Sequence, residues 1–306
     1  MNWNEIHEVD VLTGLKKITA SSVDCVIIDP PYNIGYDFGN NKCKKEIQEY
    51  VEWSLSWIQE SKRILKPSGT MFIYGFSEIL AHLSIRLEMD HRWLIWHYTN
   101  KTTPSSKFWQ RSHESIICAW KNKTERIFNL DKVREPYTEG FKKGYGSGKK
   151  IRPNTKGRFN NMKEDSAEEK KTYYKVNEIG ALPRDVFKIS TLAGGSGAKS
   201  RIAFCKKCDV AILGKKERKF HEQHEETNKD KKNTIINHPT QKPFEVSKRL
   251  MLSCMPEYGK IVIPFAGSGS ECLVAKKLNF EFIGFDLNPE YVRMSNKLIE
   301  KKDIKL

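Results

Sequence analysis

The chain alternates short apolar runs with longer stretches in which apolar residues recur at helical spacing. Residues 23–28 are apolar except for one aspartate, which is typical of a strand buried on both faces of a sheet. Residues 46–65 place apolar side chains three or four positions apart, which predicts an amphipathic helix that ends at a Lys-Pro-Ser-Gly sequence. The same patterns predict a helix at residues 77–88 and further strands at residues 70–74, 93–98 and 115–120.

The alternation is lost over residues 123–201, where turn residues and charges dominate, and it resumes near residue 243. Helices are predicted at residues 243–255, 270–278 and 289–300, and strands at residues 260–263 and 280–285. Strands that alternate with helices indicate an α/β fold with a mostly parallel sheet. We therefore expect one α/β domain made of residues 1–122 and 238–306, interrupted by insertions at residues 123–200 and 201–237.

The charge of the chain indicates the class of partner. Its 306 residues include 53 basic and 38 acidic side chains, and the net charge of +15 favours a polyanion such as nucleic acid. Basic residues for phosphates and rings for stacking are concentrated in residues 140–175. A solvated loop or a Lys-rich proteome would explain the same composition. The aromatic residues of that segment are Phe141, Tyr145, Phe159, Tyr173 and Tyr174.

The composition also bears on location. The 7 cysteines form no framework of paired spacings, which is typical of reduced thiols. No apolar run reaches the ~18 residues that a membrane-spanning helix needs, and the N-terminal residues show no export signal. We expect a cytoplasmic, nucleoid-associated protein with no membrane partner.

The sequence Asp29-Pro30-Pro31-Tyr32 follows the apolar run at residues 23–28, at the carboxyl end of a predicted strand. Ligands bind at such strand ends in α/β sheets. The Asp29 carboxylate and the Pro30 carbonyl are acceptors that suit an exocyclic amino group, and Tyr32 offers a flat face to a nucleobase. The alternative is an ordinary proline-rich turn after a buried strand.

A glycine-rich turn, Phe265-Ala266-Gly267-Ser268-Gly269, follows the predicted strand at residues 260–263, and Asp286 ends the next strand. The glycines allow a ligand close to the backbone, and an acid at the second position accepts hydrogen bonds from ribose hydroxyls. Cys272 replaces the third glycine of a dinucleotide fingerprint, and no Gly-Lys-Ser/Thr sequence marks a phosphate loop. The pattern outlines a nucleoside site, with plain packing of a helix on the sheet as the alternative.

Together with His238-Pro239-Thr240-Gln241-Lys242-Pro243, these two sequences resemble the β class of amino-group DNA methyltransferases. The resemblance covers roughly residues 5–121 and 238–300, and residues 123–200 fall where that family has its target-recognition region. It implies a class I S-adenosylmethionine-dependent (Rossmann-like) fold: a seven-stranded, mostly parallel sheet with one antiparallel strand and circularly permuted motifs. It also implies double-stranded DNA as the substrate and S-adenosylmethionine as the cofactor.

The resemblance carries the family's functional residues over by position. Asp29, Pro30, Pro31 and Tyr32 match its catalytic motif. Asp10 would accept a hydrogen bond from the adenine amine of the cofactor. The implied cofactor-binding residues are Asp10, Val11, Leu12, Asp29, Thr240, Lys242, Pro264, Phe265, Ala266, Gly267, Ser268, Gly269, Asp286 and Leu287.

One position departs from the family. Ile263 stands where these enzymes usually have an Asp, which helps to hold the charged methionine end of the cofactor. The substitution puts cofactor affinity in doubt unless Asp29, or the region of Thr240 and Lys242, compensates.

The motif also bears on the target base. Asp29 and Pro30 would hold an adenine amino group so that its nitrogen faces the methyl donor. The base must flip out of the duplex to reach such a site, with Tyr32 as the stacking platform. The leading Asp favours adenine N6 over cytosine N4, whose enzymes often begin this motif with Ser. Cytosine C5 is disfavoured because the chain has no Pro-Cys pair to supply a nucleophile.

Residues 201–237 contain a second chemical pattern. Cys205, Cys208, His221 and His224 are spaced C-x2-C-x12-H-x2-H, one residue short of a common zinc pattern at the final gap. His221 and His224 share a helix face at this spacing. The pattern predicts a structural zinc ion that braces the recognition region. Unrelated cysteines and histidines in a Lys-rich loop are the alternative.

Several functions stay open on the sequence. The leading one is a site-specific adenine-N6 DNA methyltransferase, and the others are a cytosine-N4 enzyme or a DNA-binding subunit without turnover. Protein or RNA methylation is a further outsider. Relatives of this class often dimerise and either serve a restriction-modification system or act alone, so a homodimer and a cognate restriction endonuclease are candidate partners. The recognised DNA sequence cannot be predicted from residues 123–237, because readout by side chains depends on the geometry of the DNA groove.

Overall fold

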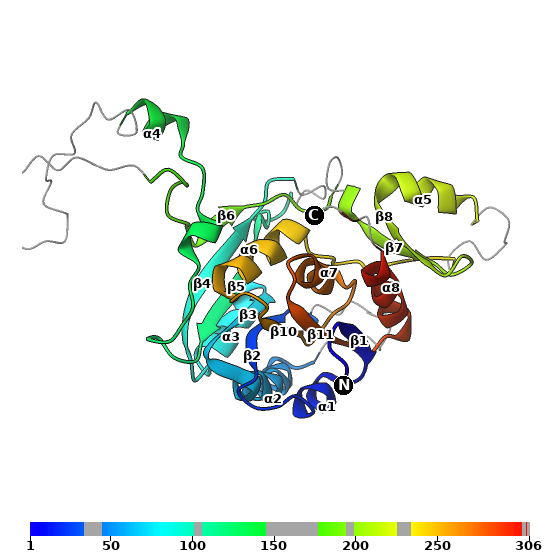
Figure 1. Ribbon diagram of the computed structural model, residues 1–306, viewed down its shortest axis with the longest axis horizontal. Helices are drawn as coiled ribbons and strands as arrows, with labels where there is room; N and C mark the ends of the chain where they lie inside the picture. The colour runs from blue at the N-terminus through cyan, green and yellow to red at the C-terminus, as the bar shows by residue number, and fades with distance from the viewer. Residues whose placement is uncertain are drawn as a thin grey trace, which may run out of the picture. The chain divides into compact units, whose positions relative to one another are not determined.

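The computed structural model describes residues 1–33, 45–100, 106–144, 177–193, 199–224, 234–301 and 304. These residues form two compact units: Met1–Asn129 together with Asp185–Leu306, and Leu130–Arg184. The larger unit holds a central sheet flanked by helices (Figure 1). None of the described helices is long and apolar enough to cross a membrane.

One sheet forms the centre of the larger unit. Within the described residues it has eight strands, in the order β1-β11-β10-β2-β3-β5-β4-β6. β5 is antiparallel to both of its neighbours, and all other pairs are parallel, as expected. The short edge strand β6 was not among the seven strands implied by the resemblance. The strands are β1 (Glu5–Glu8), β2 (Val23–Ile28), β3 (Leu65–Gly75), β4 (Asp90–His97), β5 (His113–Trp120), β6 (Val186–Lys188), β10 (Lys260–Ile263) and β11 (Glu281–Asp286).

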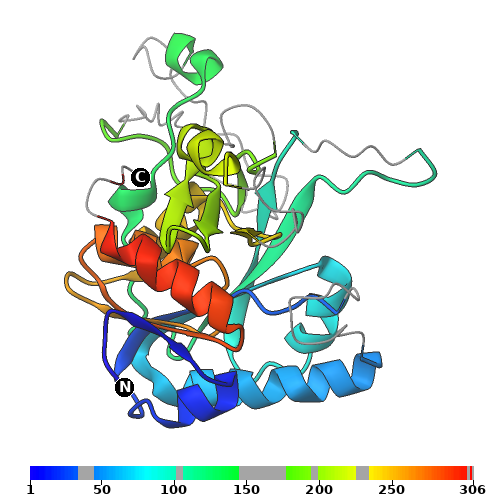
Figure 2. The ribbon, with the colours of Figure 1, turned by 90° about the vertical axis from the view of Figure 1, so that its right-hand side faces the viewer.

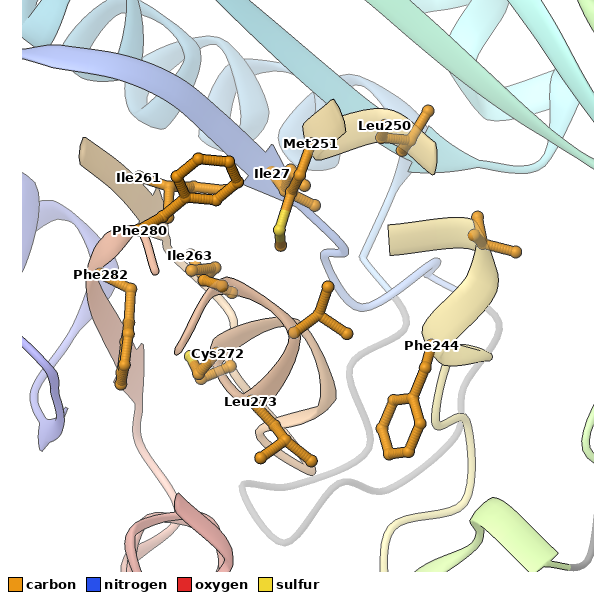
Figure 3. Close-up of a cluster of buried hydrophobic side chains, with 14 of the residues drawn as sticks. Ile27, Phe244, Leu250, Met251, Ile261, Ile263, Cys272, Leu273, Phe280 and Phe282 are labelled. Carbon is orange, nitrogen blue, oxygen red and sulfur yellow. The ribbon is translucent and has the colours of Figure 1, made fainter. Parts of the chain in front are cut away.

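Alternate residues of β2 face two different layers of helices. Cys25 and Ile27 pack in a cluster with α6, α7 and α8, part of which Figure 3 shows. Val26 and Ile28 pack in a second cluster with α1, α2 and α3. Because helices cover both faces, every residue of β2 is buried, which explains its nearly continuous apolar run. The helices are α1 (Val11–Lys16), α2 (Ile47–Ile64), α3 (Ser77–Ser84), α6 (Phe244–Cys254), α7 (Ser270–Lys277) and α8 (Pro289–Glu300).

The first and last elements of the chain lie together at one edge of the sheet. Helix α8 packs beside β1 (Figure 2). The Asn296 side chain donates to the Ile6 carbonyl at 2.8 Å and accepts from the Ile6 amide at 3.0 Å. The sequence did not predict β1 or α1, since elements of 4 and 6 residues are too short to show a period.

The largest difference from the predicted elements is in β3. We expected residues 66–69 to form a break, but α2 ends at Ile64 and the chain enters the strand at once. Pro67 is tolerated there because the pairing register between β2 and β3 shifts at this point, so the proline interrupts no regular ladder. Helix α3 also ends at Ser84, before the predicted residue 88.

The described parts of the insertions contain little regular structure. Between residues 199 and 237, strands β7 (Ile202–Cys205), β8 (Val210–Leu213) and β9 (Ile235–Asn237) form a small sheet in the order β8-β7-β9, next to α5 (Gly214–Glu222). An ion pair of 2.8 Å between Arg293 and Asp209 joins this sheet to α8.

The smaller unit contains a short 3-10 helix (Leu130–Val133), α4 (Glu139–Lys143) and a bridge between Glu135 and Ala181. Most of the basic segment, with Tyr145, Phe159, Tyr173 and Tyr174, lies outside the described residues. The domain boundaries at residues 123, 201 and 238 stay predictions.

Candidate active site

Three strand ends meet at one edge of the central sheet. β10 lies between β2 and β11 and is parallel to both, so Asp29, Pro264 and Asp286 reach the same edge. From β10 the chain continues to β11 on one side, whereas β2 leads to β3 on the other side. The crevice beyond β10 and β2 is therefore a topological switch point, where ligands bind in open α/β sheets.

A cavity of about 300 Å³ lies at this edge. Its volume is at the lower end of the range for small-molecule sites. The Asp29–Tyr32 turn, the glycine-rich turn and the segment before α6 all contribute to its wall. The lining residues are Val9, Asp10, Val11, Asp29, Pro30, Pro31, Tyr32, Asn33, Lys45, Tyr50, Trp53, His238, Thr240, Gln241, Lys242, Pro264, Phe265, Ala266, Gly267, Ser268, Ser270, Glu271, Asp286, Leu287 and Tyr291.

The cavity thus brings together nearly all the residues that the sequence proposed for catalysis and cofactor binding. Leu12 and Gly269 do not line it. Leu12 lies in the first turn of α1 and packs against the cluster around α2. Gly269 is the N-cap residue of α7, where the glycine-rich turn ends and the helix begins.

Asp10 and Asp286 are each held by backbone amides. Oδ1 of Asp10 accepts from the Leu12 amide at 3.0 Å, so this side chain caps α1. Oδ2 of Asp286 accepts from the Gly267 amide and Oδ1 from the Asn288 amide, both at 2.8 Å. Carboxylate oxygens have further lone pairs, so both acids can also accept from ligand hydroxyls or amines.

The glycine-rich turn requires both of its glycines. Gly267 has φ of +48° and Gly269 has φ of +74°, in the left-handed region. A Cβ at Gly267 would lie 2.6 Å from Nε2 of His238, and one at Gly269 would lie 2.6 Å from Cβ of Ser295. The turn can therefore pack closely against its neighbours and still present backbone to the cavity.

Aromatic residues of α2 support both turns. The Tyr50 hydroxyl donates to the Pro31 carbonyl at 2.8 Å and so fixes the proline turn. The rings of Trp53 and Trp57 each pack edge-on against Phe265, with centroids 5.8 Å apart. Trp53 and Phe265 line the cavity, so this part of its wall is aromatic and apolar.

Asp29, Tyr32, Glu114 and Lys242 form a polar network beside the cavity. The Lys242 ammonium lies 2.7 Å from Oδ2 of Asp29 and 3.5 Å from Oε2 of Glu114. The Tyr32 hydroxyl lies 2.8 Å from Oδ1 of Asp29 and 2.9 Å from Oε2 of Glu114. Because this hydroxyl carries one proton, it donates to one carboxylate at a time. The network holds Asp29 in a fixed orientation at the end of β2.

Lys242 is the cation of this network and is only 3% exposed. Burial by itself lowers the pKa of its ammonium, but the carboxylates of Asp29 and Glu114 outweigh burial and raise the pKa above its usual value. The ammonium also lies over the rings of Tyr32 and Tyr74, at 5.1 and 5.2 Å from their centroids. Lys242 therefore stays charged and balances part of the negative charge around it.

His238 lies beside the glycine-rich turn and is uncharged at neutral pH. Burial lowers the pKa of its imidazole to about 4; Asp29 opposes this shift and Lys242 adds to it. Its ring packs edge-on against Tyr291, with centroids 4.9 Å apart. His238 acts as packing for the turn rather than as a charge.

Glu114 was not predicted as a site residue. This residue is the second of β5, the antiparallel strand, so it lies at the edge where the parallel strands end. The apolar run at residues 115–120 predicted a strand but not its direction. A single acid before an apolar run is too common a pattern to mark a site.

The four predicted metal ligands lie together in the β7–β8 module. All of their ligand atoms are within 4.8 Å of one another. Sγ of Cys205 and Sγ of Cys208 lie 3.5 and 3.4 Å from Nδ1 of His224. The cysteines come from the end of β7 and the turn that follows, whereas His221 is in α5 and His224 lies just beyond it.

Comparison with known proteins agrees with this geometry. The profile of the N6/N4 methyltransferase family, described as DNA methylase, matches residues 23–297. The chain belongs to this DNA methylase family. The family acts on exocyclic amino groups of DNA with S-adenosylmethionine. The resemblance of this chain to the amino-group DNA methyltransferases is thereby confirmed.

Curated relatives of this DNA methylase span most of its length. It is 28% identical over 299 residues to the type II methyltransferase M.HpaI of Haemophilus parainfluenzae, covering 96% of this chain and 73% of the relative. It is 25% identical over 295 residues to the DNA adenine methyltransferase YhdJ of Escherichia coli (strain K12), and the match covers 95% of this chain and 81% of that relative.

Solved structures share the fold of this DNA methylase. PvuII DNA methyltransferase, described as cytosine-N4-specific, superposes with a TM-score of 0.60 at 16% identity and covers 98% of this chain and 87% of its own. M1.HpyAVI, solved as a complex with S-adenosylmethionine, superposes with a TM-score of 0.54 at 16% identity. The superposition covers 97% of this chain and 99% of M1.HpyAVI. The class I methyltransferase fold expected from the sequence is confirmed.

Proposed function

We propose that this DNA methylase transfers a methyl group from S-adenosylmethionine to the exocyclic N6 of an adenine flipped out of double-stranded DNA. The observation that carries the proposal is the Asp29 carboxylate, held by Lys242 and Tyr32 at the rim of a cavity at the sheet's switch point. A fixed acceptor at this place suits an amino group that must be aligned with a methyl donor.

The cavity fits the cofactor by chemistry and by form. Gly267 lines the cavity at a point where a Cβ would lie 2.6 Å from Nε2 of His238, so only the backbone of this residue faces the ligand. Asp286 would accept from the ribose hydroxyls, and Asp10 from the adenine amine through the oxygen that does not cap α1. When bound, S-adenosylmethionine supplies a methyl group already activated on a sulfonium, so the protein needs no covalent nucleophile of its own.

The residues around Asp29 would then orient the target nitrogen. The Asp29 carboxylate and the Pro30 carbonyl accept the two amino hydrogens, which turns the nitrogen lone pair toward the methyl donor. The Lys242 ammonium, 2.7 Å from Oδ2 of Asp29, would hold this carboxylate in place beside the amino group. Transfer would form the bond from nitrogen to the methyl carbon, break the bond from that carbon to sulfur and release S-adenosylhomocysteine, and Asp29 could accept the proton that the nitrogen loses.

Tyr32 would provide the platform for the flipped base. Its ring packs edge-on against Phe76 at 5.0 Å, and its hydroxyl is tied to the two carboxylates, so the ring cannot turn away. Flipping a base costs a few kcal/mol of lost stacking, which a stacking ring partly returns.

Cytosine N4 is the second candidate target, because the solved PvuII enzyme of like fold is described as cytosine-N4-specific. The decisive experiment incubates the protein with labelled S-adenosylmethionine and duplex DNA and then digests the DNA to nucleosides. Label in N6-methyldeoxyadenosine supports the proposal, and label in N4-methyldeoxycytidine contradicts it. DNA binding without label would favour a subunit that lacks turnover.

Partners beyond DNA belong to the same proposal. A homodimer is tested by light scattering on the purified protein, and a monomer at all concentrations would contradict it. A cognate restriction endonuclease is tested by a protection assay, in which DNA that this protein has methylated should resist cleavage by that nuclease. A cytoplasmic location is tested by fractionation of the cells.

We also propose that Cys205, Cys208, His221 and His224 hold a structural zinc ion. Two thiolates and two imidazoles are a standard tetrahedral set, and sulfur-to-nitrogen separations of 3.4 and 3.5 Å are those of ligands about one bond length from a shared centre. Metal analysis should find about one zinc per chain, lost in Cys208→Ser and kept in Cys118→Ser, whose thiol lies outside the cluster. Protein purified without zinc, and unable to take it up, would contradict the proposal.

A further inference from the structure

The Ile263 side chain cannot replace the acid that related enzymes carry at this position. It is 1% exposed and packs in the core between β10 and α7, among Ile27, Cys272 and Phe282 (Figure 3). An acid buried among these apolar side chains would be costly unless it found a hydrogen-bond partner, whereas isoleucine packs there at no such cost. The carboxylate that holds the cofactor's methionine end must come from elsewhere if it is present at all.

Glu271 is such a carboxylate. It lies in the first turn of α7, directly after the glycine-rich turn, is 5% exposed and lines the cavity. Its Oε2 accepts from the Ser270 hydroxyl at 2.6 Å and its Oε1 from the Ser247 hydroxyl at 3.3 Å. Neutral hydroxyls orient a carboxylate but leave its charge in place.

The site around Glu271 has more negative than positive charge. Asp29 and Glu114 already share the ammonium of Lys242, at 2.7 and 3.5 Å. Within the part of the chain that the structure describes, no ion pair within 4.0 Å involves Glu271. The amides of the first turn of α7 offset part of its charge, and burial together with Asp29 raises the pKa of its carboxyl. A cationic ligand group in the cavity would offset these effects and favour the charged form of Glu271.

We propose that Glu271 binds the ammonium group of the methionyl part of S-adenosylmethionine, and so supplies the acid that is missing at Ile263. The inference rests on the proposed function, since it assigns one contact of that cofactor. It differs from our expectation that Asp29 or the Thr240 and Lys242 region compensates. Lys242 is a cation, and Asp29 is already committed to it.

Binding of three ligands tests this assignment without any turnover. S-Adenosylmethionine and S-adenosylhomocysteine both carry the ammonium, whereas 5′-methylthioadenosine lacks it and keeps the adenine, ribose and sulfur. Isothermal titration should show that Glu271→Gln weakens the first two roughly 10- to 100-fold, the usual effect of losing one charge-assisted hydrogen bond. Affinity for 5′-methylthioadenosine should change less than about threefold.

Two variants complete the test. Glu271→Asp keeps the charge and should recover part of the lost affinity, and Glu257→Gln, at an exposed position, should bind all three ligands like the parent. Equal affinities of Glu271→Gln and the parent would overturn the inference, and so would an equal loss for all three ligands. If the parent protein binds none of them, the proposed function itself fails.

Discussion

The ammonium of Lys242 lies 2.7 Å from the carboxylate of Asp29, a residue 213 positions earlier in the chain. The pair joins the Asp29–Tyr32 turn after β2 to the segment that enters α6, with the Lys242 side chain 3% exposed and that of Asp29 17% exposed. Charges buried in this way stabilise a fold only together, because each is costly alone.

Removal of Lys242 should therefore destabilise the protein and stop methyl transfer. Lys242→Met leaves Asp29 and Glu114 as partly buried like charges, and we expect a loss of at most roughly 3–5 kcal/mol in the free energy of unfolding. Urea denaturation measures it. Lys62→Met, which removes an exposed ion pair with Glu88, should cost less than about 1 kcal/mol. The double variant Lys242→Met/Glu114→Gln should recover part of the lost free energy of unfolding, because one of the two like charges is removed. If the double variant loses as much as the sum of the two single variants, or more, the shared network is contradicted.

The hydroxyl and the ring of Tyr32 should have separable effects. Tyr32→Phe keeps the stacking face but frees Asp29 from one of its partners, so kcat should fall roughly 10- to 100-fold with little change in the KM for DNA. Tyr32→Ala also removes the stacking contact, worth roughly 1–3 kcal/mol, and should raise the KM for DNA as well. Steady-state kinetics on one duplex substrate compares them. Equal KM values for the two variants would argue against stacking on this ring.

His238 should make stability depend on pH. Its pKa is about 4 in the folded protein and near 6.5 when unfolded, so the unfolded chain binds the proton first as pH falls. The contribution is complete above pH 6.5 and is lost between pH 6.5 and 4, with an upper limit of about 3 kcal/mol because water still reaches part of the ring. Urea midpoints of the parent and His238→Gln should diverge in this range. Parallel curves would show that the imidazole does not titrate as described.

Gly269 should tolerate no side chain. At φ of +74°, Gly269→Ala would strain the backbone and place Cβ 2.6 Å from Cβ of Ser295, which we expect to cost roughly 2–4 kcal/mol. Gly140→Ala is the matched change, since nothing lies within 4 Å of its Cβ position in α4, and it should be neutral or slightly stabilising. Thermal denaturation followed by circular dichroism separates the two. An unchanged midpoint for Gly269→Ala would mean that the turn adapts.

The clustering of the two cysteines and two histidines could be predicted from the sequence, as could the Asp29–Tyr32 turn. Cys205, Cys208, His221 and His224 occupy a window short enough for their spacing to imply proximity, and the structure brings their ligand atoms together. The short elements β1 and α1 were not readable, because a period needs several repeats before it can be seen.

The sequence by itself determined the alternating α/β elements, the Asp29–Tyr32 turn and the glycine-rich turn. These depend on hydrophobic period and on local backbone chemistry, which act over a few residues. Only the tertiary structure decided that Glu114 and Lys242 would meet Asp29, that Ile263 would turn into the core and that Glu271 would line the cavity. Those relationships follow from strand order and from the antiparallel direction of β5, which arise when distant segments pack together and leave no local pattern.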